Sequence, residues 1–116
     1  MSADGTRVEL VRESPEVTQL RITGRLDTPG IDAVEPRFHA LLARGHGIVD
    51  LSGVTFLASL GIRMLITAAK RLDKRGNKLV LVAPRALVDQ ALKHSSIDDI
   101  IPVAADVEAA LALLGP

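Results

Sequence analysis

The segment between Asp50 and Gly61, DLSGVTFLASLG, is where residue types and spacing come closest to a reactive site. A predicted strand ends in Asp50-Leu51, a short loop follows, and Ser59 begins a predicted helix. In an α/β sheet such a loop lies at the carboxyl edge of a strand, where functional sites tend to form. A helix N-terminus offers free N–H groups and partial positive charge, so a phosphate on Ser59 would be well accommodated. Serine is also among the commonest N-cap residues, which gives Ser59 a purely structural alternative.

Other kinds of reactive site find little support in the sequence. The chain has no G-x-G-x-x-G or G-x-x-x-x-G-K-[ST] loop for nucleotides and no G-x-S-x-G elbow for a nucleophile. His39, His46 and His94 lack the i,i+4 spacing of a helical metal pair. Asp98 and Asp99 are adjacent on a turn, where neighbouring side chains point apart. We therefore expect no catalytic residue, no metal and no cofactor, and a protein that is not an enzyme.

The composition excludes several classes of protein. The 116 residues include 14 Lys or Arg and 14 Asp or Glu, and no Cys, Trp or Tyr. Without Cys there is no disulfide, thiolate metal site or thiol chemistry. Net neutrality and scarce aromatic rings argue against nucleic-acid binding. No apolar run reaches the ~18–20 residues of a spanning helix, and the first ten residues lack the apolar core of a leader. We expect a cytoplasmic protein that does not insert into membranes.

Short β runs alternate with amphipathic stretches along the chain, in the order β-β-α-β-α-β-α-β-α. Strands are expected at 7–13, 17–23, 47–51, 78–82 and 100–103, and helices within 31–43, at 59–75, from Pro84 and at 107–114. The first two strands are close enough for an antiparallel hairpin. The later alternation implies a largely parallel sheet with right-handed crossovers. The prediction is one α/β domain over 1–116, with a mixed, mostly parallel sheet, an opening hairpin and about four helices.

Some local features of these elements are less regular. Segments 24–30 and 52–57 are expected as loops. Pro36 is awkward inside a helix, so we expect the first helix to begin near Ala33 or to have a bent first turn. Gly76 is the expected stop of the long helix. The apolar stripe of that helix is expected at Ile62, Leu65, Ile66, Ala69 and Leu72.

Three segments carry a family resemblance: LRITGRLD at 20–27, IVDLSGVTFLASLG at 48–61 and GNKLVLV at 76–82. The first resembles the second strand and the "G-x-L-D" turn of the STAS domain. The second resembles its "D-L-S-x-V-x-F-x-D-S-S-G" signature, and the third its "G-G-x-L-x-L" fourth strand. The resemblance runs from about Val8 to Leu114 and is greatest to bacterial anti-sigma factor antagonists. It implies a STAS-like fold.

The resemblance also implies a function. Such antagonists bind an anti-sigma factor and so free a sigma factor for transcription. The anti-sigma factor is commonly a serine kinase that phosphorylates the antagonist and thereby breaks the complex, and a phosphatase reverses the modification. When the family's functional residues are placed on this sequence, the phosphate acceptor corresponds to Ser59. The family's loop Asp corresponds to Asp27, and its strand-end Asp corresponds to Asp50. A phosphate adds up to about two negative charges to the docking surface, and a cost of about 3 kcal/mol would weaken binding more than a hundredfold.

The expected docking surface combines the 27–30 loop with the first turn of the long helix. Its residues are Asp27, Thr28, Asp50, Ala58, Ser59, Leu60, Gly61 and Arg63. Leu60 and Met64 are expected either to offer apolar contact there or to pack within the protein itself. The chain departs from the signature at Ala58, where the family has Asp, and at Leu60, where it has Ser. After the third helix, the family's "S-G-L" reads Ser95-Ser-Ile97.

An alternative keeps the fold and changes the partner. STAS domains also serve as accessory subunits of transporters and of larger sensory assemblies. A separate subunit of that kind, for example a cytoplasmic component of an ABC transporter, would not be phosphorylated on Ser59. The altered sequence Ala58-Ser-Leu-Gly61 gives this alternative weight. On either reading we expect a monomer or a weak dimer.

Overall fold

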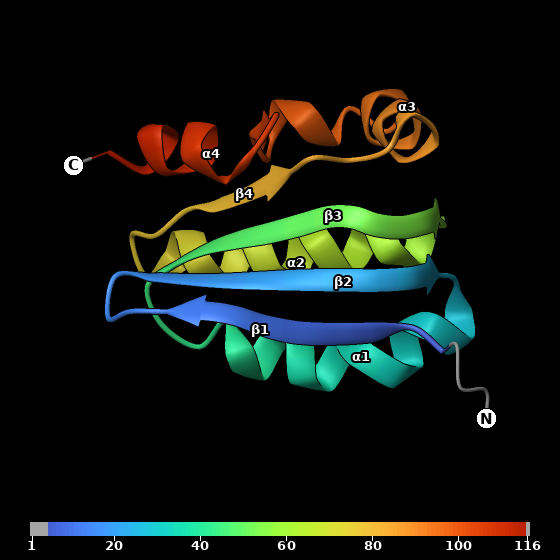
Figure 1. Cartoon of the computed structure of the whole chain (residues 1–116), viewed down its shortest axis with the longest axis horizontal. Helices are drawn as coiled ribbons and strands as arrows, with labels where there is room; N and C mark the ends of the chain where they lie inside the picture. The colour runs from blue at the N-terminus through green and yellow to red at the C-terminus, as the bar shows by residue number, and fades with distance from the viewer. Residues whose placement is uncertain (1–4, 116) are drawn as a thin grey trace.

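The computed structural model describes residues 5–115, which form a five-stranded sheet and four α-helices (Figure 1). The elements are β1 (Arg7–Glu13), β2 (Val17–Leu26), α1 (Thr28–Leu41), β3 (His46–Leu57), α2 (Ser59–Lys74), β4 (Leu79–Val82), α3 (Ala86–His94), the 3₁₀ turn η1 (Ile97–Asp99), β5 (Val103–Ala104) and α4 (Val107–Leu114). Residues 1–4 and 116 of the expected 1–116 domain, including part of the segment searched for a leader, lie outside the described residues.

The strands lie side by side in the order β1-β2-β3-β4-β5. β1 is antiparallel to β2, and each later strand is parallel to its neighbour. The predicted α/β fold, with an opening hairpin on a mostly parallel sheet, is therefore confirmed. β4 has the sequence LVLV and is buried along its whole length, as expected of a strand covered on both faces.

β3 is longer than predicted, because segment 52–57 continues the strand instead of forming a loop. Its pairing with β2 shifts register between Arg21 and Thr23, next to Gly53. A Cβ on Gly53 would lie 2.5 Å from the Thr23 methyl group. Glycine here marks a strand irregularity with close contact, not the end of the strand. As a result β2 and β3 run on together and end side by side.

α1 begins at Thr28, so the predicted start near Ala33 and the predicted loop over 24–30 are both wrong. Asp27 is the N-cap and Pro29 stands in the first turn, where its missing N–H costs nothing. Pro36 lies inside the helix. It is tolerated there because Asp32, whose carbonyl loses its i+4 donor, is exposed to water, as is Pro36 itself.

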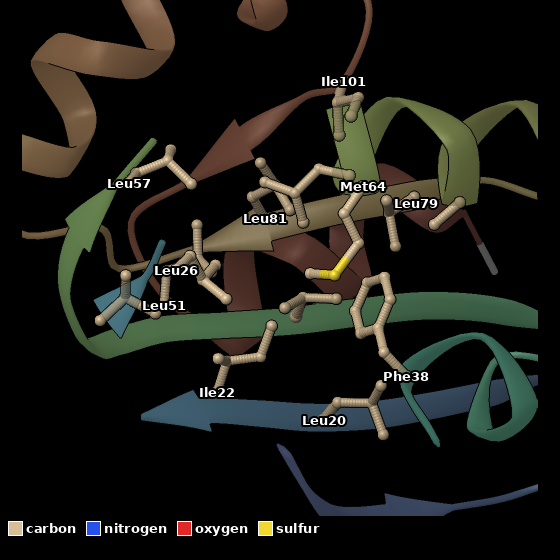
Figure 2. Packing of buried hydrophobic residues seen from close by; sticks show 14 of the residues in the cluster. Leu20, Ile22, Leu26, Phe38, Leu51, Leu57, Met64, Leu79, Leu81 and Ile101 are labelled. Carbon is tan, nitrogen blue, oxygen red and sulfur yellow. The ribbon is translucent and has the colours of Figure 1, made fainter. Parts of the chain in front are cut away.

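α2 buries a face that is rotated slightly from the predicted stripe. The buried residues are Gly61, Met64, Leu65, Ala68 and Leu72, whereas Ile62, Ile66 and Ala69 are partly buried beside them. Met64 is 1% exposed and points into the cluster that contains Phe38 and Leu79 (Figure 2). Of the two alternatives for Met64, packing within the protein is the one that the structure shows. The helix gives way to Gly76 in a left-handed conformation, as predicted.

Two apolar clusters lie on opposite faces of the sheet. The larger one packs α1, α2 and α3 against residues such as Leu20, Val49 and Leu81. The smaller one packs α4, through Ala110, over Ile48 and its neighbours on the other face. In Figure 1, α1 and α2 lie behind β1, β2 and β3, on the far face of the sheet in this view.

The last elements differ in detail from the prediction. α3 begins at Ala86 with Arg85 as its N-cap, two residues after Pro84. η1 takes up the chain after α3, so β5 is only Val103–Ala104. Ser96, which stands where the family has glycine, has a positive φ of 59°. A non-glycine residue there is strained in a way that glycine is not.

Candidate functional site

The carboxyl ends of β2 and β3 bring the starts of α1 and α2 together. Leu26 pairs with Leu57 at the end of the ladder. The Ala58 backbone N–H then donates to the Leu26 carbonyl at 3.0 Å. The two helices therefore start from adjacent positions on one edge of the sheet, and their first turns form a common surface.

The start of α1 is held by Asp27. One carboxylate oxygen accepts the Gly30 backbone N–H at 3.0 Å, and the other accepts Arg25 Nε at 3.0 Å. The Gly30 N–H, followed by the Arg25 guanidinium, holds the pKa of Asp27 below its usual value of 3.8. Gly30 is required by close packing, since a Cβ there would collide with the Arg25 carbonyl and lie 2.5 Å from the Thr6 hydroxyl.

The start of α2 lacks a side-chain cap. Ala58 is the N-cap residue and has no side-chain hydrogen bond, whereas Ser59 is the first residue of the helix and is exposed. The structural alternative for Ser59, that it caps α2, is therefore wrong. The turn sits directly on the strand ends, because a Cβ on Gly61 would lie 2.7 Å from a Leu57 methyl group and 3.2 Å from the Leu26 carbonyl.

This arrangement presents a hydroxyl at the positive end of a helix dipole. The first-turn N–H groups of α2 have no side-chain acceptor from Ala58, so an anion attached to Ser59 would find donors close by. Arg63 lies one turn further along the helix and is exposed. At i,i+4 spacing it adds a positive charge on the same side of α2.

The structure gathers most of the predicted surface and leaves out one residue. Thr28, Ser59, Leu60 and Arg63 are exposed, Asp27 and Ala58 are partly exposed, and Gly61 is buried beneath them. Asp50 is not part of this surface. At about 3.3 Å per residue, β3 carries Leu57 roughly 20 Å beyond it.

Asp50 instead forms a polar contact on the face of the sheet opposite α1 and α2. It is 9% exposed. Its carboxylate accepts Arg21 Nε at 3.2 Å and the Ser52 backbone N–H at 2.8 Å. Burial raises the pKa of Asp50, but the hydrogen bonds from Ser52 and the charge of Arg21 lower it by more. This contact links Arg21 of β2 to Asp50 of β3.

Two residues of the surface escaped sequence reasoning. The Arg25 guanidinium lies 4.4 Å above the centre of the Phe56 ring, within cation–π range. Phe56 is 41% exposed, and Leu60 nearby in sequence is 42% exposed. The signal was present, because strand alternation carried through 52–57 places Phe56 on the opposite face from buried Leu57. Treating that segment as a loop concealed it.

The rest of the described chain adds no second reactive cluster. Within residues 5–115, no group of three His, Asp or Glu side chains could hold a metal ion. His39 pairs with Glu35 at 3.2 Å, and His46 Nδ1 accepts the Lys78 backbone N–H at 2.9 Å. Across the part of the chain that the structure describes, every helix is too short or too polar to span a bilayer.

Comparison with known proteins identifies the family. The sequence model of the STAS domain matches residues 10–110. The protein belongs to the STAS domain family. The parallel strands, the "G-x-L-D" turn ending at Asp27 and the Ser59 helix are thus parts of a STAS domain. A search of the curated proteins finds no significant match.

Solved structures share the fold of this STAS domain. An anti-sigma factor antagonist from Mycobacterium paratuberculosis is 21% identical with a TM-score of 0.85, covering 99% of this chain and 98% of that one. The Bacillus cell fate determinant SpoIIAA in its phosphorylated form is 16% identical with a TM-score of 0.69, over 92% and 99%. The STAS domain of a SulP transporter from Vibrio cholerae is 22% identical with a TM-score of 0.66, over 88% and 83%. At such identities the likeness establishes the fold alone.

Proposed function

We propose that this STAS domain is a bacterial anti-sigma factor antagonist, a non-catalytic cytoplasmic switch that binds an anti-sigma factor and so releases a sigma factor for transcription. The observation that carries the proposal is the 3.0 Å hydrogen bond from the Ala58 N–H to the Leu26 carbonyl. It joins the residue before Asp27 to the residue before the exposed Ser59, and so supports the common surface that the family resemblance implies. The likeness to antagonist structures supports the same function.

The partner is proposed to dock on apolar and cationic anchors around Ser59. Phe56 and Leu60 are large apolar side chains that are about two-fifths exposed, and Arg25 lies over the Phe56 ring. Aromatic and Arg side chains carry much of the binding energy in protein interfaces. Asp27 and Thr28 lie on the α1 side of this surface, and Arg63 on the α2 side.

Control is proposed to come from phosphorylation of Ser59 by the anti-sigma factor acting as a serine kinase. The Ser59 Oγ bonds to the terminal phosphorus of the kinase-bound ATP, ADP leaves, and the hydroxyl proton passes to the kinase. The phosphate adds up to about two negative charges in the middle of the docking surface, and the partner must then desolvate or repel them. A cost of about 3 kcal/mol lowers the affinity more than a hundredfold. A phosphatase restores binding.

The test uses the purified chain with the serine kinase encoded nearest to it, labelled ATP and mass spectrometry. We expect the label on Ser59, its loss in Ser59→Ala, and release of the kinase from the labelled protein. Ser52→Ala is the matched control, because Ser52 is also exposed but lies on β3, away from the start of α2. Labelling that survives in Ser59→Ala refutes the assigned acceptor.

A second candidate is supported by Ala58. The residue before the acceptor offers no side-chain hydrogen bond to the helix start, unlike the Asp of the family signature. An accessory subunit of a transporter or sensory assembly, unphosphorylated at Ser59, would not need that carboxylate. Co-purification with a transporter, together with an unmodified Ser59 in cells, would favour this candidate over the first. On both we propose a monomer or weak dimer, which sedimentation measures directly.

A further inference from the structure

A groove of about 480 Å³ opens at the other end of the sheet, beside the first residues of β4. Its volume lies within the range of ligand-binding sites, roughly 300–1,000 Å³. The apolar residues that line it are Ala69, Leu79, Val80, Ile100, Pro102 and Leu113. Ile100 and Leu113 are 56% and 48% exposed, so the wall formed by the approach to β5 and by α4 leaves apolar surface open to water.

One edge of this groove is an interrupted strand ladder. Leu81 N–H donates to the Pro102 carbonyl at 3.0 Å, and Ala83 N–H to the Ala104 carbonyl at 3.0 Å. Strand backbone groups alternate in direction along the chain. The N–H and C=O of Leu79 therefore face β5, as those of Leu81 do. The next donor in a parallel ladder would be residue 102, but proline has no N–H. Consistent with this, the register between β4 and β5 begins only at Leu81 and Val103.

The rim of the groove carries an excess of positive charge. Lys70 and Lys78 line it and are exposed, together with one carboxylate, Asp73. The ion pairs found within residues 5–115 involve neither lysine. The groove thus combines an apolar wall, a strand edge without a ladder donor and two lysines.

We propose that this groove binds the apolar C-terminal end of a peptide from a partner protein. Such an end supplies aliphatic side chains for the wall, a backbone amide for Leu79 and a free carboxylate for Lys70 and Lys78. Strand edges and carboxylate capture are both established modes of peptide recognition. The site lies at the opposite edge of the sheet from Ser59, so the proposal does not depend on the proposed function.

The test is an NMR titration of the full chain with the tripeptide N-acetyl-Val-Leu-Val bearing a free carboxylate. We expect saturable shifts at the amides of Leu79, Lys78 and Ile100, and slower hydrogen exchange at Leu79. The same tripeptide with an amidated C-terminus should bind about threefold to tenfold more weakly, because it lacks the charge that meets the lysines. Lys78→Glu should abolish that difference.

Two leucines of α4 provide a matched pair of variants. Leu113→Glu places a charge in the groove and should weaken peptide binding by at least about tenfold. Leu111→Glu adds the same charge at a similarly exposed site, 44% against 48%, that does not line this groove, and should bind normally. The dispersion of the spectra shows whether each variant is folded.

Four outcomes would overturn the proposal. The first is the absence of saturable shifts at peptide concentrations up to about 1 mM. The second is equal binding of the carboxylate and the amide. The third is decanoate producing the same shifts as the peptide, including the slowed exchange at Leu79, which would indicate a site for small amphiphiles. The fourth is a fall in the sedimentation coefficient of the free protein caused by Leu113→Glu, which would indicate a second copy of the chain in the groove.

Discussion

The starts of α1 and α2 lie next to each other but are built in different ways. At the start of α1, the Asp27 carboxylate accepts from both Gly30 and Arg25, and Gly30 packs against the Arg25 backbone. At the start of α2, Ala58 has no capping side chain and Ser59 faces solvent. The first start is fixed from within the chain, whereas the second leaves backbone donors available to another group.

This difference bears on what an added phosphate would encounter. A carboxylate at position 58 would occupy first-turn donors of α2 and place a negative charge beside Ser59. With Ala58 the positive end of the helix dipole is uncompensated by a neighbouring side chain. The departure from the family signature therefore weakens the local structure of α2 while leaving its start better suited to hold an anion.

The largest expected effect comes from adding a methyl group to each helix start. Gly30→Ala should lower the free energy of unfolding by about 3 kcal/mol, because the new Cβ meets the Arg25 backbone, which cannot move aside. Gly61→Ala should cost about 1 kcal/mol, because its nearest neighbour is a Leu57 methyl group at 2.7 Å that can rotate. Urea unfolding measures both. Equal losses would show that α1 is not the more rigid start.

A capping carboxylate at position 58 should make the start of α2 more like the capped start of α1. Ala58→Asp is expected to raise the free energy of unfolding by about 1 kcal/mol, since it supplies the missing N-cap acceptor. Thr28→Asp adds the same charge to α1, whose cap is already occupied by Asp27, and should gain only about 0.3 kcal/mol. Thermal and urea unfolding of the two variants give the comparison. A gain from Thr28→Asp as large as that from Ala58→Asp would mean that charge alone matters.

The sequence predicts the α2 start well and the α1 start poorly. The clear apolar period after Ser59 predicts a helix that begins there, and α2 does begin at Ser59. For α1, Pro36 favours a late start, but a proline inside a helix costs little where the freed carbonyl belongs to an exposed residue, here Asp32. The capping role of Asp27 depends on the Gly30 N–H being turned back toward it, and propensity alone does not show that.

The surface residues were harder to predict than the fold, for a tertiary reason. Phe56 lies against Arg25 because β2 and β3 extend together beyond an irregularity at Gly53, whereas the glycine had indicated a loop. Met64 is buried because the helix face that meets the sheet is set by packing against residues such as Phe38. The added length of β3 also separates Asp50 from Ser59. The same added length brings Phe56, near the end of the strand, close to Ser59.

Removing the ring from the Arg25–Phe56 contact should have a smaller effect. Phe56→Leu keeps an apolar side chain but abolishes the cation–π contact, and should cost about 0.5 kcal/mol of stability at this exposed site. Arg25→Gln removes the same contact and also the charge beside Asp27, so it should cost slightly more. Urea unfolding measures the free energy of unfolding of both variants. The difference between the two values gives the contribution of the Arg25–Asp27 ion pair at the start of α1. No difference would mean that Arg25 acts on Phe56 alone.

The smallest expected effect is a difference in acid sensitivity between the two helix starts. The folded pKa of Asp27 is below 3.8, mainly through the Gly30 N–H and then through Arg25. In acid the unfolded chain therefore takes up this proton at a higher pH than the folded chain does. The contribution of Asp27 to the free energy of unfolding is complete above pH 3.8. It is lost as the pH falls through the lower pKa that Asp27 has in the folded chain.

Asp27→Asn tests this, because Asn also caps helices but does not titrate. The free energies of unfolding of the wild type and the variant should differ by a constant amount near neutral pH. The difference should shrink only below about pH 4, where the wild type loses the contribution of Asp27. Asp50 also has a lowered pKa, but it is common to both proteins and cancels in the difference. Ala58→Asp should instead add acid sensitivity, by giving α2 the kind of start that α1 has. If the wild type and Asp27→Asn lose stability in acid to the same extent, the starts of α1 and α2 differ in packing and not in charge.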